Sequence, residues 1–584
     1  MSIKDKQAIA IWEESIQMKD GHYELAIPFR NRPPDLVNNR CMAERRLQSL
    51  GKRLQGDTQL KLKYSEGMKD LVAKKYAEIV NEDELAHNGT VWYLPHHPVY
   101  HPMKPEKLRI VFDCASMHHG MSLNKQVLSG PDLTNKLLGV LLRFRQETVA
   151  LMADVQAMFH QDECTVHLFG GTWSPSCCNF ALRHTALDNC SDFHPDTVDT
   201  VLRNFYVDDC LKSVSTEEKG IEIARELCSL LARGGFKLTK WISNNTKVLA
   251  SIPVEERAKD VKELDLNYEA LPTERALGMQ WDVEHDCIGY KISPKDKPLT
   301  QRGILSVVSS IYGPHGFVSP FTLKAKLIIQ DLSQKKLGWD EALEPEPLRR
   351  WLKWKQDLPK IEEYKINRCL KPNDFGEIDS YQLHHFSDAS ELAYGAVSYL
   401  RMTSKEHSHC CLLLAKGHLA PIKKVTIPRL ELMGATLSVK LDAMMRRELE
   451  LDFPIDGFWM DSTIVLQYVK NEEKRFHTFV ANRISLIHSG SSPSQWRHVD
   501  SKSNPADDVS RGLSATEMID NERWLHGPSF LWLDKEDWPK SPLLRQLKDE
   551  DPEIKPNKEV VTICYIQSCS ELNRQAVGTT LIVA

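Results

Sequence analysis

The amino-acid sequence predicts a multidomain protein of the α+β and α/β classes. The chain has 584 residues, which is enough for about four domains of ordinary size. In two stretches, residues 92–243 and 380–512, short apolar runs of strand length alternate with amphipathic helical patterns. Hydrophobic residues make up 41% and charged residues 27% of the sequence, which is typical of globular proteins with sizeable cores.

The composition also excludes several classes of protein. No apolar run approaches the ~18 residues that a membrane-spanning helix needs, so we expect no membrane partner. Acidic residues at positions 5, 13 and 14 lie where a signal peptide would be apolar. The 14 cysteines include no C-x-x-C pair, which disfavours a disulfide framework and a structural zinc site. With 75 basic and 80 acidic residues the net charge is -5, so nucleic acid must be bound by local basic patches.

The first predicted element is a basic helical segment over residues 40–75, with ten Lys or Arg residues, four acidic residues and no proline. It is either a solvated helix face or a surface that follows phosphates. Strands are predicted over residues 108–112, 149–153 and 205–207, and the apolar spacing over 198–205 predicts a helix before the last strand. The capping box Ser215-x-x-Glu218 predicts a further helix that stops at the glycines 234 and 235.

In the C-terminal half, prolines and acids at 343–347 predict a surface turn, and a linker is predicted near residues 371–374. Strands are then predicted around residues 384–387, 396–400 and 457–460. Residues 534–560 contain eight acidic and six basic residues but few large apolar ones. We therefore expect a loosely ordered tail there.

Adjacent carboxylates at Asp208 and Asp209 are the sharpest local feature of the sequence. They follow a predicted strand and precede another short one, as in a hairpin turn. A lone Asp-Asp pair is usually a solvated turn, but a second apolar strand ends on Asp154. Strands that end on acids can bind Mg²⁺ through carboxylates and substrate phosphates. Two such ions could assist a phosphoryl transfer.

The segment Tyr206-Val-Asp-Asp209 resembles the catalytic hairpin of retroelement reverse transcriptases, and the wider chain resembles BEL/Pao-type LTR retrotransposon polyproteins. The motifs that carry this resemblance cover most of the chain. They are Tyr93-Leu-Pro-His-His-Pro98, Lys107-Leu-Arg-Ile-Val-Phe-Asp113, Leu142-Arg-Phe-Arg-Gln146, Val166-His-Leu-Phe-Gly-Gly171, Trp173-Ser-Pro-Ser176, Gly235-Phe-Lys-Leu-Thr-Lys-Trp241, Leu277-Gly-Met-Gln-Trp-Asp282 and Arg302-Gly-Ile-Leu-Ser306.

The resemblance implies a right-hand polymerase with fingers, palm and thumb or connection, followed by a ribonuclease H-like mixed sheet with flanking helices. It divides the chain into a basic N-terminal arm (1–90), fingers and palm (91–250), a thumb or connection region (251–375), a ribonuclease H-like domain (376–515) and a tail toward a missing integrase region (516–584). The implied palm metal ligands are Asp154, Asp208 and Asp209. The residues implied to contact nucleotide or nucleic acid are Arg109, Phe169, Gly170, Tyr206 and Lys240. Lys240 is either the acid that protonates pyrophosphate or a solvated lysine.

The later acids resemble the four-acid site of a type 1 ribonuclease H domain, which hydrolyses the RNA strand of an RNA/DNA hybrid. They are Asp388, Glu431, Asp461 and Asp507. Taken singly, each is more often a surface carboxylate or a helix cap. Two divalent cations and a developing charge on phosphorus need several carboxylates. We interpret the neighbouring Asp508 as a cap or surface acid.

The sequence departs from the family in one place. Only residues 162–165 lie between Gln161 and the strand that leads to Phe169, where relatives have two to three dozen more. We therefore expect that Asp154 is not easily brought opposite Asp208 and Asp209, and that ribonuclease H activity is better supported than RNA-directed DNA polymerase activity. The alternative is a decayed or domesticated remnant that binds nucleic acid without catalysis.

The resemblance also implies cofactors, partners and a location. The expected cofactor is Mg²⁺, for which Mn²⁺ can substitute. The expected partners are an RNA template, DNA and RNA/DNA hybrid, together with the protease and integrase of the full-length element. The expected location is the cytoplasm, within a retroelement particle, or the nucleus.

Overall fold

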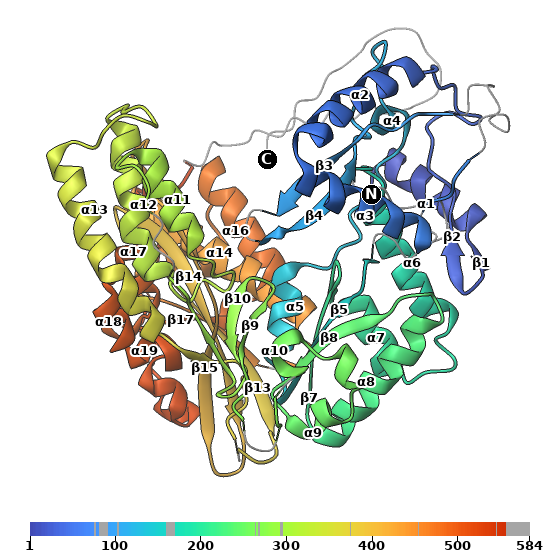
Figure 1. Cartoon of the computed structure of the whole chain (residues 1–584). Helices are drawn as coiled ribbons and strands as arrows, with labels where there is room; N and C mark the ends of the chain where they lie inside the picture. The colour runs from blue at the N-terminus through green and yellow to red at the C-terminus, as the bar shows by residue number, and fades with distance from the viewer. Residues whose placement is uncertain are drawn as a thin grey trace, which may run out of the picture.

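The computed structural model describes residues 1–74, 77–80, 91–101, 104–158, 170–262, 264–266, 269–292, 296–373, 375–453, 455–544 and 546–555 (Figure 1). Within these residues the strands form mixed and antiparallel sheets that are flanked by helices. The predicted mixture of α and β structure is therefore confirmed. No helix among the described residues is long and apolar enough to cross a membrane.

The N-terminal part consists of helices and two short hairpins. Helix α1 (Ile3–Ser15) precedes strands β1 (Gln17–Lys19) and β2 (His22–Glu24). The predicted basic helical segment forms α2 (Arg40–Gly56) and α3 (Thr58–Ala73), which lie beside the hairpin of β3 (His96–His101) and β4 (Lys104–Phe112) in Figure 1. An ion pair of 2.6 Å between Arg46 and Asp113 connects α2 to the end of this hairpin.

The next part contains a four-stranded antiparallel sheet in the order β6-β7-β5-β8. Its elements are α4 (Leu123–Gln126), α5 (Leu137–Phe144), β5 (Val149–Val155), α6 (Ser174–Asp188), α7 (Pro195–Arg203), β6 (Phe205–Tyr206), β7 (Asp209–Val214), α8 (Glu217–Ala232), β8 (Leu238–Ser243) and α9 (Thr246–Ala250). The predicted strands and helices are confirmed here with small shifts. Helix α8 begins one residue later than predicted, because the side chain of Thr216 accepts from the amide of Lys219.

A second four-stranded sheet, in the order β12-β11-β10-β9, lies between the two larger parts. The elements of this region are η3 (Val254–Glu256), α10 (Lys259–Lys262), β9 (Thr273–Ala276), β10 (Met279–Asp282), β11 (Cys287–Gly289), α11 (Gln301–Ser310), α12 (Ser319–Gln334), α13 (Pro345–Asp357), η4 (Leu358–Glu363) and β12 (Ile366–Asn367). The predicted surface turn at 343–347 is wrong. Pro345 and Pro347 lie in the first turn of α13, where a missing backbone N–H costs no hydrogen bond.

The C-terminal part is built on a five-stranded mixed sheet in the order β15-β14-β13-β16-β17. The first three strands in sequence are antiparallel, whereas β16 runs parallel to β13 and β17 runs parallel to β16. The elements are β13 (Ser380–Ala389), β14 (Ala393–Thr403), β15 (Ser408–Leu419), α14 (Ile427–Glu448), β16 (Ile455–Met460), α15 (Thr463–Lys470), α16 (Thr478–Gly490), η5 (Pro493–Gln495), β17 (Trp496–His498), η6 (Ser501–Ser503), α17 (Ala506–Arg511), α18 (Ala515–Ile519), α19 (Glu522–His526), η7 (Ser529–Trp532) and η8 (Lys535–Asp537).

Helices cover both faces of this sheet, because alternate side chains of a strand point to opposite faces. Ala396 and Leu400 of β14 pack with Leu437 of α14. Val397 and Tyr399 of the same strand belong to a different apolar cluster, which includes residues of α12 and α17. The α11–α13 region therefore packs against the five-stranded sheet.

Apolar contacts and buried arginines connect this domain to the β5–β8 sheet. Phe144 of α5 lies in the same apolar cluster as Phe386 of β13. Arg143 of α5 is buried and forms a 2.9 Å ion pair with Glu448 at the end of α14. Between them, in the region of the β9–β12 sheet, Arg368 is fully buried, pairs with Asp286 at 2.6 Å and donates to backbone carbonyls that follow α5. The two parts thus share one packed interface.

The prediction of a loosely ordered tail over 534–560 is wrong for its described residues up to 555. Glu553 is buried and forms an ion pair of 2.6 Å with Arg429 of α14. The backbone of Ile554 pairs with Phe476, and Trp538 is buried in the core. These contacts join segments more than 70 positions apart, so no local pattern could reveal them. Residues 556–560 lie outside the described residues.

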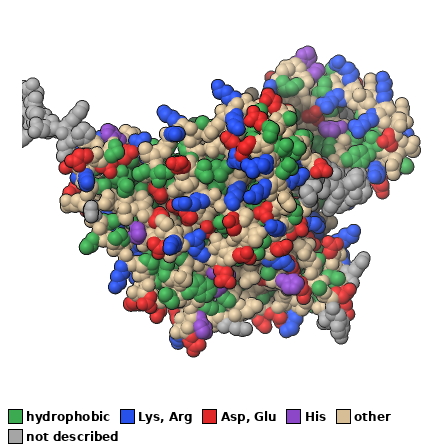
Figure 2. All heavy atoms as spheres, turned by 90° about the vertical axis from the view of Figure 1, so that its left-hand side faces the viewer, with side chains coloured by type: hydrophobic (Ala, Val, Ile, Leu, Met, Phe, Trp, Pro, Cys, Tyr) green, Lys and Arg blue, Asp and Glu red, His purple; other side chains and the backbone are tan. Residues whose placement is uncertain are grey.

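Charges are mixed on the face of the molecule that carries α12 and α13. Figure 2 shows basic and acidic side chains interspersed over this face. This mixture agrees with the small net charge of -5. This face therefore presents no single field that would attract a polyanion.

Candidate metal centres

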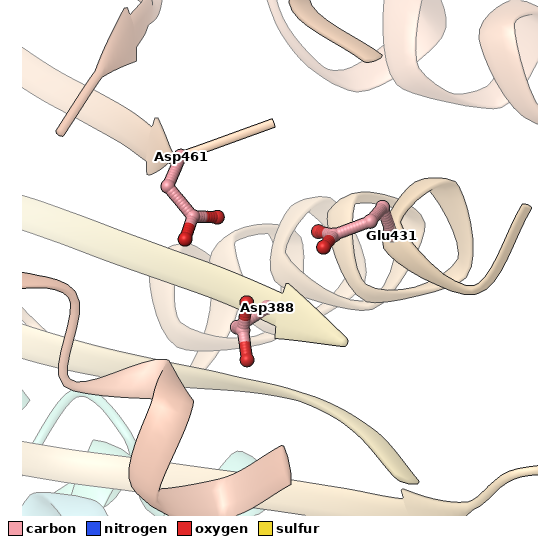
Figure 3. A group of neighbouring side chains, drawn as sticks. All are labelled: Asp388, Glu431 and Asp461. Atoms are coloured by element: carbon pink, nitrogen blue, oxygen red, sulfur yellow. The ribbon is translucent and has the colours of Figure 1, made fainter. Parts of the chain in front are cut away.

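Three carboxylates meet at one edge of the five-stranded sheet. Asp388 lies at the C-terminal end of β13, Asp461 directly follows β16, and Glu431 lies near the start of α14. Because β13 and β16 are parallel neighbours, their C-terminal ends lie together. Each residue offers one oxygen, and these oxygens all lie within 4.8 Å of one another. Figure 3 shows the three carboxylates pointing toward a common space.

Burial and mutual repulsion raise the pKa values of two of these acids. Burial, followed by the charges of Asp388 and Asp461, raises the pKa of Glu431 to about 9. Burial also raises the pKa of Asp388 to about 7, although a hydrogen bond from Ser510 acts in the opposite direction. Oε2 of Glu431 and Oδ1 of Asp461 are buried and have no hydrogen-bond partner among the described residues. No donor among the described residues therefore offsets the negative charge at these two oxygens directly.

Serine and asparagine side chains hold these acids in place. Ser510 of α17 is fully buried and donates to Asp388, and Ser501 donates to Oδ2 of Asp461 at 2.5 Å. Asn504 donates to the carbonyl of Ser387, next to Asp388, at 3.1 Å. The sequence analysis did not identify these three residues, although Asn504 and Ser510 lie three positions on either side of the predicted acid Asp507.

Asp507, the predicted fourth acid, does not join this group within the described part of the chain. Its carboxylate instead pairs with Arg511, four residues later on α17, at 2.5 Å. Asp507 still lies near enough that its charge raises the pKa of Asp388. Three of the four predicted acids are thus brought together, and the fourth lies beside them.

The interpretation of Asp508 as a cap or surface acid is wrong. Asp508 is buried, accepts from Arg523 at 2.8 Å and accepts from Asn521 at 3.0 Å. The two neighbouring acids point to different sides of a short helix, because successive helical residues are rotated by about 100°. Asp508 therefore holds α17 against the segment that contains α19.

A second acidic cluster lies on the β5–β8 sheet. Strands β5 and β7 pair in a register that places Asp154 opposite Asp209. Strands β6 and β7 form a hairpin in which Tyr206 pairs with Asp209, so that Val207 and Asp208 form the turn. Val207 has a φ of 57°, in the left-handed region. The expectation that the short segment after Gln161 keeps Asp154 away from this pair is therefore wrong.

The reason is that β5 pairs directly with both β7 and β8, and all three lie outside the shortened segment. The segment itself, residues 159–169, lies outside the described residues. Burial, followed by the charges of Asp208 and Asp154, raises the pKa of Asp209 to about 7. The pKa of Asp208 is raised chiefly by burial. Lys240, an exposed residue, pairs with Oδ2 of Asp154 at 2.6 Å.

The predicted nucleotide-contacting residues lie in different environments. Phe169 lies outside the described residues. Gly170 has a φ of 118°, and a Cβ there would lie 2.4 Å from the carbonyl oxygen of Phe112, so this glycine permits a close approach to β4. Arg109 of β4 lies near enough to lower the pKa of Asp208. Tyr206 lies near Tyr312, a 40% exposed residue that sequence reasoning missed.

The mixed sheet with its helices on both faces and its acids at the shared strand ends is that of a ribonuclease H-like domain. Residues 300–462 match the family described as "Pao retrotransposon-like RNaseH-like domain". This segment of the chain is thus similar to Pao retrotransposon RNaseH-like domains, which confirms the resemblance predicted from the motifs. The match begins at α11 and ends just after Asp461, so it excludes the Asp507 region. No curated protein matches the sequence.

Solved structures of foamy viral protease-reverse transcriptase are similar to the chain. The structure with dsDNA has 14% identity and a TM-score of 0.44, covering 85% of this chain and 92% of that chain. The dRH form with dsDNA has 15% identity and a TM-score of 0.43, covering 70% and 65%. The structure with RNA/DNA hybrid has 16% identity and a TM-score of 0.41, covering 72% and 51%. The chain thus covers less than two thirds of the foamy viral chain in each of the last two structures.

Proposed function

We propose that this chain hydrolyses the RNA strand of RNA/DNA hybrids at the cluster of Asp388, Glu431 and Asp461. The observation that carries the proposal is the convergence of three carboxylates, two with unpartnered buried oxygens, at the edge of a ribonuclease H-like sheet. Buried anions without a partner are costly, so such a group needs protons or cations. A retroelement origin follows from the same family match.

The residues of this cluster fit Mg²⁺, with Mn²⁺ as a substitute. Carboxylate oxygens are the ligands that Mg²⁺ prefers, and the ion usually keeps places for water and substrate phosphate. When bound, such ions activate a water molecule and stabilise charge on the phosphoryl oxygens. Oε2 of Glu431 and Oδ1 of Asp461, which have no hydrogen-bond partner among the described residues, would be ligands of such an ion.

Residues of the protein would orient the metal-binding carboxylates, and Glu431 would hold or release a proton. Ser510 and Ser501 restrict the carboxylates of Asp388 and Asp461 to one orientation each. Glu431, with its pKa of about 9, keeps its proton at neutral pH until a cation replaces it. Cation binding and proton release are therefore coupled at Glu431.

Asp461→Asn tests the hydrolysis. The change keeps the size of the side chain but removes the charge, so hybrid cleavage in Mg²⁺ should fall by about two orders of magnitude or more. Hybrid affinity should change little. Asp520→Asn, at an exposed acid just after α18 in the C-terminal part, is the matched control and should cleave like the wild type. Cleavage that survives in Asp461→Asn would refute the assignment.

RNA-directed DNA polymerisation is a second candidate function, favoured by the placement of Asp154 opposite Asp209 beside Lys240. Asp154, Asp208 and Asp209 would be the metal-binding acids, and an RNA template with a DNA primer would be the substrate. Primer extension with Mg²⁺ or Mn²⁺ tests this, with Asp209→Asn as the inactive comparison. Primer extension that is equal in the wild type and in Asp209→Asn would not depend on the Asp209 carboxylate and would refute the assignment.

The remaining alternative is a remnant that binds nucleic acid without turnover. It predicts hybrid binding that is equal in the wild type and in Asp461→Asn, with no cleavage by either in Mg²⁺ or Mn²⁺. A gel assay of hybrid cleavage by the wild type therefore distinguishes the remnant from the proposed hydrolase. In a full-length element, protease and integrase segments would accompany this region.

A further inference from the structure

The ion pair between Asp507 and Arg511 lies at the border of the carboxylate cluster. The two residues are four apart on α17, and Nε of Arg511 lies 2.5 Å from Oδ1 of Asp507. The side chain of Arg511 is 65% exposed and that of Asp507 is 27% exposed. The pair is therefore open to solvent on the arginine side.

Arg511 also acts on the cluster at a distance. Its positive charge lowers the pKa values of both Asp388 and Glu431, against the effect of burial. Arg511 is thus a basic residue whose charge favours the ionised form of both Asp388 and Glu431. Its neighbour Ser510 donates directly to Asp388, which ties the end of α17 to the cluster. Arg511 thus combines an exposed side chain with a position beside the carboxylate cluster.

We propose that Arg511 is a phosphate-binding latch, which pairs with Asp507 in the free protein and releases it when a backbone phosphate of the hybrid takes its place. This inference rests on the proposed hydrolysis, because it assigns the substrate contact and the fourth acid of that same site. Asp507, once released, can face Asp388 and complete the predicted quartet.

The exchange is favourable for a physical reason. An exposed ion pair between side chains is weak, since water and salt screen it. A guanidinium can bind a phosphate through two parallel hydrogen bonds, which a single Nε contact to a carboxylate does not provide. Release of Asp507 then returns a negative charge to the cluster at the moment when cations bind there.

Two variants test the latch with opposite expected signs. In EDTA, Arg511→Gln should weaken hybrid binding and reduce the slope of log affinity against log salt by about one, because one phosphate contact is lost. Asp507→Asn should instead strengthen hybrid binding in EDTA, because it frees Arg511. Arg511→Lys keeps the charge and should keep the salt slope.

Manganese binding, measured by electron paramagnetic resonance, supplies a second readout. Arg511→Gln should bind Mn²⁺ several-fold more tightly than the wild type, because it removes a cation and frees a carboxylate. A merely structural arginine would weaken both Mn²⁺ and hybrid binding when it is replaced. Arg302→Gln is the matched control, since Arg302 is also 65% exposed and paired with an aspartate, Asp340. It should change neither quantity.

The outcomes separate the latch from the proposed function. An unchanged salt slope in Arg511→Gln, or weaker Mn²⁺ binding, would overturn the latch even if the wild type cleaves hybrids. Failure of the wild type to cleave would overturn the hydrolysis, whereas the binding measurements would still decide the role of Arg511. Equal thermal midpoints of the variants would confirm that they are folded.

Discussion

Replacing Glu431 with glutamine should change how the stability of the metal-free protein depends on pH. The pKa of Glu431 is raised from an ordinary value of 4.5 to about 9 by burial and by the neighbouring charges of Asp388 and Asp461. Between these pH values the folded protein keeps a proton that the unfolded chain has lost. The free energy of unfolding of the wild type must therefore fall as pH rises from 4.5 toward 9.

The size of the effect follows from the shift. At pH 7, which is about 2.5 units above the ordinary pKa, one such group lowers the free energy of unfolding by about 3 kcal/mol relative to pH 4.5. Glutamine keeps the shape of the protonated acid and does not titrate. The stability of Glu431→Gln minus that of the wild type should therefore increase by about 3 kcal/mol between pH 4.5 and pH 7.

Urea denaturation in EDTA at a series of pH values measures this difference. Glu222→Gln, at an exposed glutamate of α8, is the matched control and should show no such trend. Adding Mg²⁺ should stabilise the wild type by about 3 kcal/mol at a concentration 100 times its dissociation constant, and should stabilise Glu431→Gln less. A difference between variant and wild type that does not change with pH would refute the reasoning.

Three further outcomes are expected. Asp508→Asn should lower the free energy of unfolding by about 2 kcal/mol in urea, because it weakens a buried charged hydrogen bond to Arg523; an unchanged midpoint would contradict this. A fragment that begins at residue 376 should be less soluble than one spanning 300–555, because it lacks α12, which covers the sheet face at Tyr399; equal solubility would contradict this. Hybrid affinity of the whole chain should fall steeply as salt rises, owing to the basic segment 40–75, and a flat dependence would contradict it.

The placement of the acids on strand ends could be predicted because the signal is local. An apolar run that stops at Asp388 or Asp461 indicates both a buried strand and the residue at its end. Strands β13 and β16 bear this out. The meeting of these acids with Glu431 could be predicted only through the resemblance, because strand pairing is not a local property.

The missed features depend on contacts between distant segments. No short pattern distinguishes Asp507 from Asp508, since only the docking of Arg523 decides which carboxylate is buried. The same holds for Glu553, whose partner Arg429 lies more than 120 positions away. The sequence alone does not reveal that Asp154 lies opposite Asp209, because a shortened segment does not indicate that the remaining strands β5 and β7 pair directly.

The two acidic clusters should respond differently to pH, because their most perturbed acids have different pKa values. Above pH 7 the carboxyl group of Asp209 is more than half ionised, since its pKa is about 7. Glu431, with a pKa of about 9, still competes with cations there. Between pH 7 and 8.5, Mn²⁺ affinity at the Glu431 cluster should rise by up to about tenfold per pH unit, because each bound ion displaces one proton.

The two sites can be measured one at a time. Asp209→Asn leaves the Glu431 cluster intact, and Asp461→Asn leaves Asp154, Asp208 and Asp209 intact. Electron paramagnetic resonance of Mn²⁺ should show affinity that rises steeply with pH in the first variant and little in the second. Equal pH dependence in both would show that Glu431 does not hold its proton at neutral pH, and the proposed coupling of cation binding to proton release would then fail.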